Sequence, residues 1–305
     1  MNETSPIWLL GAPFSGSAWV AGCLHQHPQL YALPQLDLLL ADTIGDALKV
    51  FELGQGTHGQ GLRRAVAWLM YQRQDDQGIR LANAWLAERA EWSCKQLIEL
   101  FAQTVAPRRL VIPDDDAALR PVAYLRIQAI SPQPQILHLT RHPWSQGVLL
   151  HQWSREHVFI PLDYKDHSFI PPQVEPQLPW FAANQNLLNW RAQWPAAQSA
   201  QLRSEDFESN NHEAAARLCQ WLDIQDDPAV LEAMRDPRDW VFAQPGPTLA
   251  PAGLDAEAQA RFSDRTLALA EQQRLDTALP WRADGQGFAD ATLALAEALG
   301  YAQRV

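Results

Sequence analysis

The chain has 305 residues, and 24 Lys and Arg against 35 Asp and Glu give it a formal net charge of −11 at pH 7. Hydrophobic residues make up 47% of it, which is enough to fill a sizeable core and too much for a disordered chain. A negative global field repels nucleic acids and anionic membranes, so the charge argues against binding either. Any polyanionic ligand must therefore be held by a local group of donors.

Cysteine usage and the first residues indicate the compartment. Cys23, Cys94 and Cys219 are widely spaced and form neither a disulfide framework nor a metal-binding pattern, which favours a reducing environment. The chain begins without a basic segment, and its first apolar run is broken by Pro13 and Gly16. No apolar stretch reaches the roughly 18 residues of a membrane-spanning helix. We expect a cytoplasmic protein.

The chain opens with a strand, a tight loop and a helix. The continuous apolar run over residues 7–10 predicts a buried strand, and residues 18–24 suit a buried helix. Further segments repeat this alternation: helical periodicity over 60–104, strands over 109–112, 135–139 and 200–203, and helices from 143, over 212–222 and over 289–299. Strands alternating with helices predict an α/β fold with a largely parallel sheet. Since no clean linker interrupts the sequence, we expect one domain over 1–305.

Residues 155–180 form a long segment rich in Pro, His, Asp and aromatic residues. In a compact α/β domain such a segment is typical of a lid or substrate-binding loop, although a plain surface excursion has the same composition.

The loop over residues 11–18 has the spacing G-x4-G between the first strand and the first helix. Glycine permits a tight turn, and main-chain N–H groups at a helix N-terminus bind anions without a side-chain cation. The Lys and Ser/Thr of a nucleoside-triphosphatase are replaced by Ser17 and Ala18, so hydrolysis of ATP or GTP is not expected. The loop predicts a metal-free phosphate site, or else a tight turn that binds nothing.

Arg141 follows the strand over 135–139, just before a helix. This is the edge at which α/β proteins bind ligands, and a guanidinium binds phosphate with two parallel hydrogen bonds.

Together these segments resemble the sulfotransferases that use 3′-phosphoadenosine 5′-phosphosulfate (PAPS). Residues 13–19 resemble the loop that holds the 5′-phosphosulfate, and residues 137–143 resemble the strand and turn that bind the 3′-phosphate. The His-Pro step at 27–31, the segment 202–207 and the closing 299–301 follow in the family's order.

The resemblance implies a sulfotransferase-like P-loop fold, in which helices flank a central parallel sheet. It implies transfer of a sulfuryl group from PAPS to a hydroxyl or amine of a small or carrier-bound acceptor, with adenosine 3′,5′-bisphosphate (PAP) as product and no metal. The residues that would bind the cofactor are Phe14, Ser15, Gly16, Ser17, Ala18, Arg141 and Ser145.

Several positions depart from the family pattern. Phe14 stands where the family carries a loop cation, Gln35 where many relatives have a Glu base, and Leu149 where a serine binds the 3′-phosphate. Asp37 lies on the same side of an extended segment as Gln35, and Ser145 lies one helical turn closer to Arg141 than Leu149, so each is a candidate replacement. Asp37 also suits a helix cap.

The catalytic base would then be Asp37 or a histidine of the 155–180 segment, for which we take His167. The candidates to supply the cation that is missing at Phe14 are Lys165, His167, Arg63 and Arg64. The run Asp114–Asp116 suits a cationic acceptor or a metal, but an exposed acidic loop is the simpler expectation. If the losses are not replaced, the alternative is a non-catalytic or repurposed sulfotransferase-fold protein that binds a ligand or serves as a partner of another protein.

Overall fold

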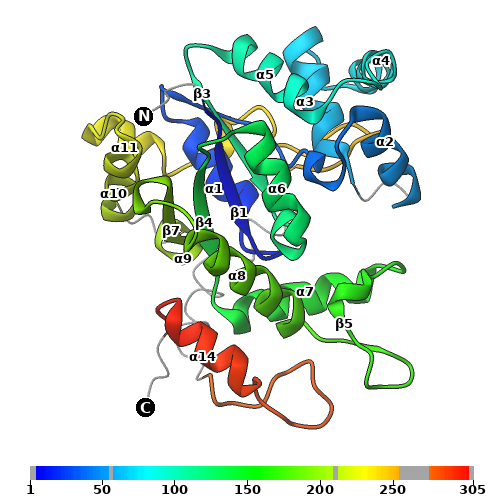
Figure 1. Cartoon of the computed structure of the whole chain (residues 1–305), viewed down its shortest axis with the longest axis vertical. Helices are drawn as coiled ribbons and strands as arrows, with labels where there is room; N and C mark the ends of the chain where they lie inside the picture. The colour runs from blue at the N-terminus through cyan, green and yellow to red at the C-terminus, as the bar shows by residue number, and fades with distance from the viewer. Residues whose placement is uncertain (1–4, 55–57, 209–211, 254–274, 302–305) are drawn as a thin grey trace.

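A computed structural model describes residues 5–54, 58–208, 212–253 and 275–301. Within these ranges a five-stranded parallel sheet has the order β2-β3-β1-β4-β7 (Figure 1). Its strands are β1 (Ile7–Gly11), β2 (Leu30–Ala32), β3 (Arg109–Asp114), β4 (Gln135–Thr140) and β7 (Ser199–Arg203). All residues of β1 and β4 are buried, as expected for central strands of a parallel sheet.

Helices cover the sheet and extend from its edges. In Figure 1, α6 and α8 pass in front of the sheet, α2 to α5 form a group at the β3 side, and α10 and α11 lie at the β7 side. Their bounds are α1 (Ser17–His25), α2 (Ile44–Leu53), α3 (Gln60–Tyr71), α4 (Asp76–Ala87), α5 (Cys94–Val105), α6 (Pro121–Ile130), α7 (Pro143–Glu156), α8 (Gln177–Arg191), α9 (Ser204–Glu208), α10 (His212–Leu222), α11 (Pro228–Ala233) and α14 (Asp290–Ala298).

The register of the strands brings distant segments to one edge. Gly11 of β1 lies beside Leu139 of β4, and Leu10 lies beside Asp114 of β3. Because parallel strands end on the same side, the loop after β1, the turn after β3 and the residue after β4 meet at the carboxyl edge of the sheet, where open α/β sheets bind ligands.

The α/β fold with a parallel sheet is confirmed, and so are the strands at 7–10, 109–112, 135–139 and 200–203. The segment 155–180 is more regular than expected. It holds the last two residues of α7, the antiparallel pair β5 (Lys165–Asp166) and β6 (Gln173–Val174), and the start of α8. Whether it acts as a lid stays a prediction. No helix in the described ranges is both long and apolar enough to cross a membrane.

Candidate functional site

The loop between β1 and α1 is a tight turn with two residues in the left-handed region. The main-chain N–H of Ser15 donates to the carbonyl of Ala12 at 3.1 Å, and φ is 68° at Phe14 and 87° at Gly16. Glycine adopts this conformation freely, whereas a bulky side chain such as Phe14 rarely does. Strain of this kind is typical of functional loops.

The turn delivers the chain to a helix N-terminus. The main-chain N–H of Val20 donates to the carbonyl of Gly16 at 3.1 Å, so the N–H groups of Ser17 and Ala18 precede the first intrahelical hydrogen bond. These groups and the helix dipole favour an anion here without a lysine.

The loop lies close to the sheet and is hydrogen-bonded to α7. A Cβ on Gly11 would lie 2.7 Å from Ser15 Oγ and 2.8 Å from the carbonyl oxygen of Leu139, so only glycine fits there. From α7, the buried side-chain amide of Gln146 donates to the carbonyl of Pro13 at 2.6 Å.

The Phe14 side chain lies against α7. Its ring centroid is 5.7 Å from that of Trp153, which in turn stacks on His157 at 4.3 Å. At the position where the sequence resemblance implies a cation, the structure therefore has an aromatic contact between the loop and the end of α7.

Arg141 is 2% exposed at the carboxyl end of β4. Its Nε donates to Ser204 Oγ at 3.1 Å, and its main-chain carbonyl accepts from Trp180 Nε1 at 2.9 Å. Burial lowers the pKa of Arg141 to about 10, so the guanidinium is charged at neutral pH. Glu205 faces it, but the Glu205 oxygens accept from the main-chain N–H of His142 and the hydroxyl of Tyr301.

Ser145 is the third residue of α7, four residues after Arg141, and is 2% exposed. Its Oγ is buried and has no hydrogen-bond partner within the described residues. A buried hydroxyl without a partner costs about 1–3 kcal/mol, which a ligand that accepts its hydrogen bond would recover.

Four carboxyl groups gather beside the loop; we call Asp37, Asp114, Asp115 and Asp116 the carboxyl cluster. The amide of Gln35 joins them, because its Nε2 lies 2.7 Å from Asp37 Oδ1 and 3.5 Å from Asp116 Oδ2. The expectation of an exposed acidic loop is wrong: Asp114 is buried, and its two successors are only partly exposed. In the described part of the chain, no group of His, Cys, Asp and Glu is arranged to hold a metal ion.

Burial and mutual repulsion shift the cluster's acidities. Burial first, and the neighbouring Asp116 second, raise the pKa of Asp37 to about 6. Burial likewise raises the pKa of Asp115 to about 7, against a hydrogen bond from Ser17 that lowers it. The pKa of the fully enclosed Asp114 is raised well above its usual range by burial and by Asp37.

The two predicted bases occupy different environments. Asp37 is buried, and its Oδ2 accepts the main-chain N–H of Gly59 at 2.5 Å. His167 is exposed in the turn between β5 and β6, where its Nε2 lies 3.3 Å from the carbonyl oxygen of Leu162. Within the described residues no hydrogen bond joins His167 to the carboxyl cluster. Tyr164, which directly precedes β5, does contact the cluster: its hydroxyl donates to Asp116 Oδ1 at 3.4 Å.

The sequence did not identify one member of this neighbourhood, His58. His58 Nε2 lies 3.5 Å from Asp116 Oδ2, and this hydrogen bond raises the pKa of His58.

Arg64, a candidate replacement cation, is buried elsewhere: its Nη1 donates to the main-chain carbonyls of Gln244 and Ala252. Arg64 thus fastens α3 to a later loop.

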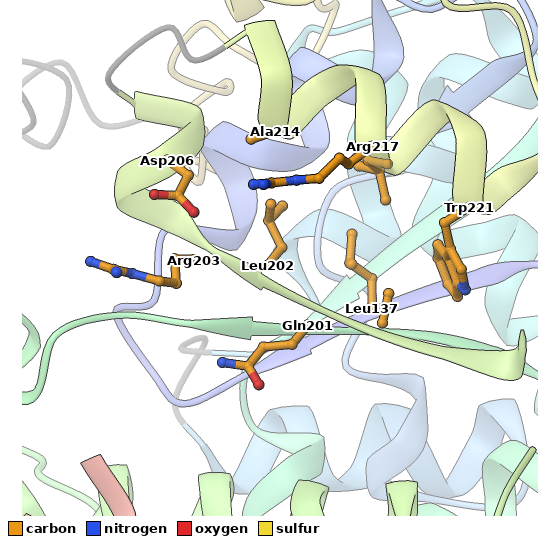
Figure 2. Close-up of a pocket in the computed structure, with 10 residues that line it drawn as sticks. Leu137, Gln201, Leu202, Arg203, Asp206, Ala214, Arg217 and Trp221 are labelled. Atoms are coloured by element: carbon orange, nitrogen blue, oxygen red, sulfur yellow. The ribbon is translucent and has the colours of Figure 1, made fainter. Parts of the chain in front are cut away.

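A separate cavity of about 340 Å³ lies between β7 and α10 (Figure 2). Its polar lining includes Gln201, Arg203, Asp206 and Arg217, while Leu137 and Trp221 are among its apolar walls. None of the predicted site residues lines it.

Comparison with known proteins agrees with the geometry. The sequence model of the sulfotransferase family matches residues 6–228. The sulfotransferase domain of the curacin biosynthetic pathway has a similar structure, with a TM-score of 0.71 at 20% identity over 98% of this chain and 99% of that one. The sulfotransferase domain of the Synechococcus PCC 7002 olefin synthase gives 0.71 at 21% identity over 98% and 95%. No curated protein sequence matches the chain.

Proposed function

The chain belongs to the sulfotransferase family, and from that premise we propose that it transfers a sulfuryl group from PAPS to a hydroxyl or amine of a small or carrier-bound acceptor. The observation that carries the proposal is the meeting of two anion-binding elements at one sheet edge. One is the turn before α1, and the other is the buried guanidinium of Arg141 with the unpartnered hydroxyl of Ser145.

The residues present fit the cofactor. Main-chain N–H groups at Ser17 and Ala18 would bind the 5′-phosphosulfate, within the loop that Phe14, Ser15 and Gly16 form. Arg141 and Ser145 would bind the 3′-phosphate. PAPS supplies the sulfuryl group, and no metal is needed for its transfer.

The protein must also accept the proton that the acceptor loses. The carboxyl cluster lies beside the loop, and a carboxyl whose pKa is raised toward neutrality suits this role. Asp37 is the candidate from the sequence, and His167 is the second.

Phe14 favours a second function, in which the chain binds PAPS or PAP without catalysing transfer. Loss of one preorganised charged group typically costs about 10²–10³ in rate, and no cation replaces Phe14 in the loop itself. Such a protein would bind the nucleotide and leave the sulfuryl group in place.

Two measurements separate these functions. PAP at a hundred times its Kd should stabilise the protein by about 2.7 kcal/mol, seen as a rise in Tm, and Arg141→Lys should reduce that rise. The exposed Arg155 on α7 offers a matched control, since Arg155→Lys should leave the rise intact. Transfer of ³⁵S from PAPS to hydroxyl and amine probes then identifies an enzyme. Absence of any PAP-dependent rise in Tm contradicts both functions.

A further inference from the structure

Asp115 connects the carboxyl cluster to the anion-binding loop. It directly follows β3, and its carboxyl accepts a hydrogen bond from the side chain of Ser17, the first residue of α1. Its main-chain N–H faces Gln35 Oε1 at 3.5 Å, which holds the start of the turn. Asp115 is thus the member of the cluster that contacts the loop proposed to bind the phosphosulfate.

One oxygen of Asp115 has no protein partner in the part of the chain that the structure describes. Its Oδ1 is buried and lacks a hydrogen-bond partner within the described residues. It is the one carboxylate oxygen in those ranges that is buried in this way. A buried carboxylate oxygen is costly without a donor, so this position suits the hydroxyl or amine hydrogen of an acceptor.

Asp37, in contrast, has both carboxyl oxygens engaged. Oδ1 accepts from the Gln35 amide at 2.7 Å, and Oδ2 accepts from the main-chain N–H of Gly59 at 2.5 Å. The bond to Gly59 holds the segment around Asp37 against the start of α3. Since both carboxyl oxygens of Asp37 are bonded to protein donors, neither is left for an acceptor.

We propose that Asp115 is the catalytic base of the transfer and that Asp37 is a positioning residue; this rests on the proposed function. As the acceptor oxygen or nitrogen forms its bond to sulfur, the bond from sulfur to the bridging oxygen breaks and its electron pair stays on the departing PAP. The acceptor's proton passes to the Asp115 carboxylate.

The charges around Asp115 suit this role. Burial is the largest cause that raises the pKa of Asp115, and Asp116 and Asp37 add to it. The Ser17 hydrogen bond and Arg141 lower it, and the net pKa is about 7. A base of this acidity is largely ionised at slightly alkaline pH and still binds a proton well. The same negative charge beside the loop opposes the binding of an anion, so its removal should tighten PAP binding.

The test compares Asp115→Asn with Asp37→Asn and with Asp163→Asn, a control at a surface carboxylate paired with Arg120. PAP affinity is measured by calorimetry, and single-turnover ³⁵S transfer from PAPS to 2-naphthol and 2-phenylethylamine is followed from pH 5 to 9. We expect Asp115→Asn to bind PAP at least as tightly as the wild type, to lose at least a hundredfold in transfer, and to lose the acidic limb of the pH profile. Asp37→Asn should retain that limb.

Carbon-13 NMR of the aspartate carboxyls gives a second readout without cofactor. A resonance that titrates near pH 7 should vanish in Asp115→Asn, and Ser17→Ala should move it to higher pH. Titration of Asp115 near pH 4, or full transfer in Asp115→Asn, would overturn the base assignment alone. A wild type that binds no PAP would overturn the proposed function and this assignment together.

Discussion

The side-chain amide of Gln146 donates to the main-chain carbonyl of Pro13 at 2.6 Å, across 133 residues of sequence. Gln146 is fully buried on α7, while Pro13 begins the turn that carries Phe14. This bond fixes the loop against the helix that also carries Ser145.

Gln146→Leu should therefore weaken PAP binding without unfolding the protein. It removes the donor to Pro13 and leaves that carbonyl without its bond, which costs about 1–3 kcal/mol, and the loop loses its fixed position. We expect PAP affinity to fall about tenfold by calorimetry. Gln152→Leu, at an exposed position of the same helix, is the control. Equal PAP affinity in both variants would show that Gln146 has no role in positioning the loop.

Ser145→Ala separates ligand binding from stability. Because Ser145 Oγ is buried without a partner in the described ranges, its removal should leave the Tm of the free protein unchanged or raise it. If the hydroxyl donates to a phosphate, PAP affinity should fall about tenfold. Ser154→Ala removes a hydroxyl of the same helix that donates to the carbonyl of His151 at 2.8 Å, and it should leave PAP affinity unchanged. A lower Tm with unchanged affinity in Ser145→Ala would mean that the hydroxyl serves the fold alone.

The sheet and the loop were predictable because their signals are local. An uninterrupted apolar run over 7–10, followed by G-x4-G, identifies a buried strand and its turn within twelve residues. Arg141 likewise directly follows the apolar strand β4. The three-residue strand β2 is too short to show a periodicity, and the sequence did not predict it.

The carboxyl cluster was not predictable because it depends on contacts between distant segments. Asp37 and Asp116 are 79 positions apart, and Gln35 bonds to both. In the sequence the run Asp114–Asp116 has the pattern of a solvated turn. In the folded chain these carboxyl groups are buried near one another, and burial with their mutual repulsion raises the pKa values of Asp114 and Asp115. The contact between Phe14 and Trp153 is equally nonlocal.

Phe14→Lys tests whether the missing loop cation limits the reaction. A lysine at this position would place a positive charge in the turn, where the sequence resemblance implies a cation. We expect tighter PAP binding and about 10²-fold faster single-turnover ³⁵S transfer from PAPS. Phe14→Leu, which also loses the ring contact with Trp153 but adds no charge, is the matched control. Equal rates for the two variants would show that charge at this position does not limit transfer.

Asp114→Asn should stabilise the protein increasingly as pH rises. Burial and the neighbouring Asp37 raise the pKa of Asp114 well above its usual value, so the folded protein binds this proton more tightly than the unfolded chain does. Wild-type stability therefore falls as pH rises above about 4, toward the raised folded-state pKa. Asparagine does not ionise, and its Oδ1 can still accept the main-chain N–H of Ala117, which Asp114 accepts at 2.8 Å.

The expected result is a similar Tm for variant and wild type at pH 4 and a higher Tm for Asp114→Asn at pH 8. Asp75 gives a control of opposite sign, because a hydrogen bond from Arg73 lowers its pKa to about 2 and its carboxyl caps α4. The ionised Asp75 carboxylate therefore stabilises the fold at pH values above its unfolded-state pKa, and this stabilisation is lost as the pH falls toward 2. Asp75→Asn should lower the Tm at pH 7, and the decrease in Tm should be smaller at pH 3. Burial should make the pKa of Asp114 differ between the folded and the unfolded state. A Tm difference between Asp114→Asn and the wild type that stays constant from pH 4 to 8 would show that the two pKa values are the same and would contradict this prediction.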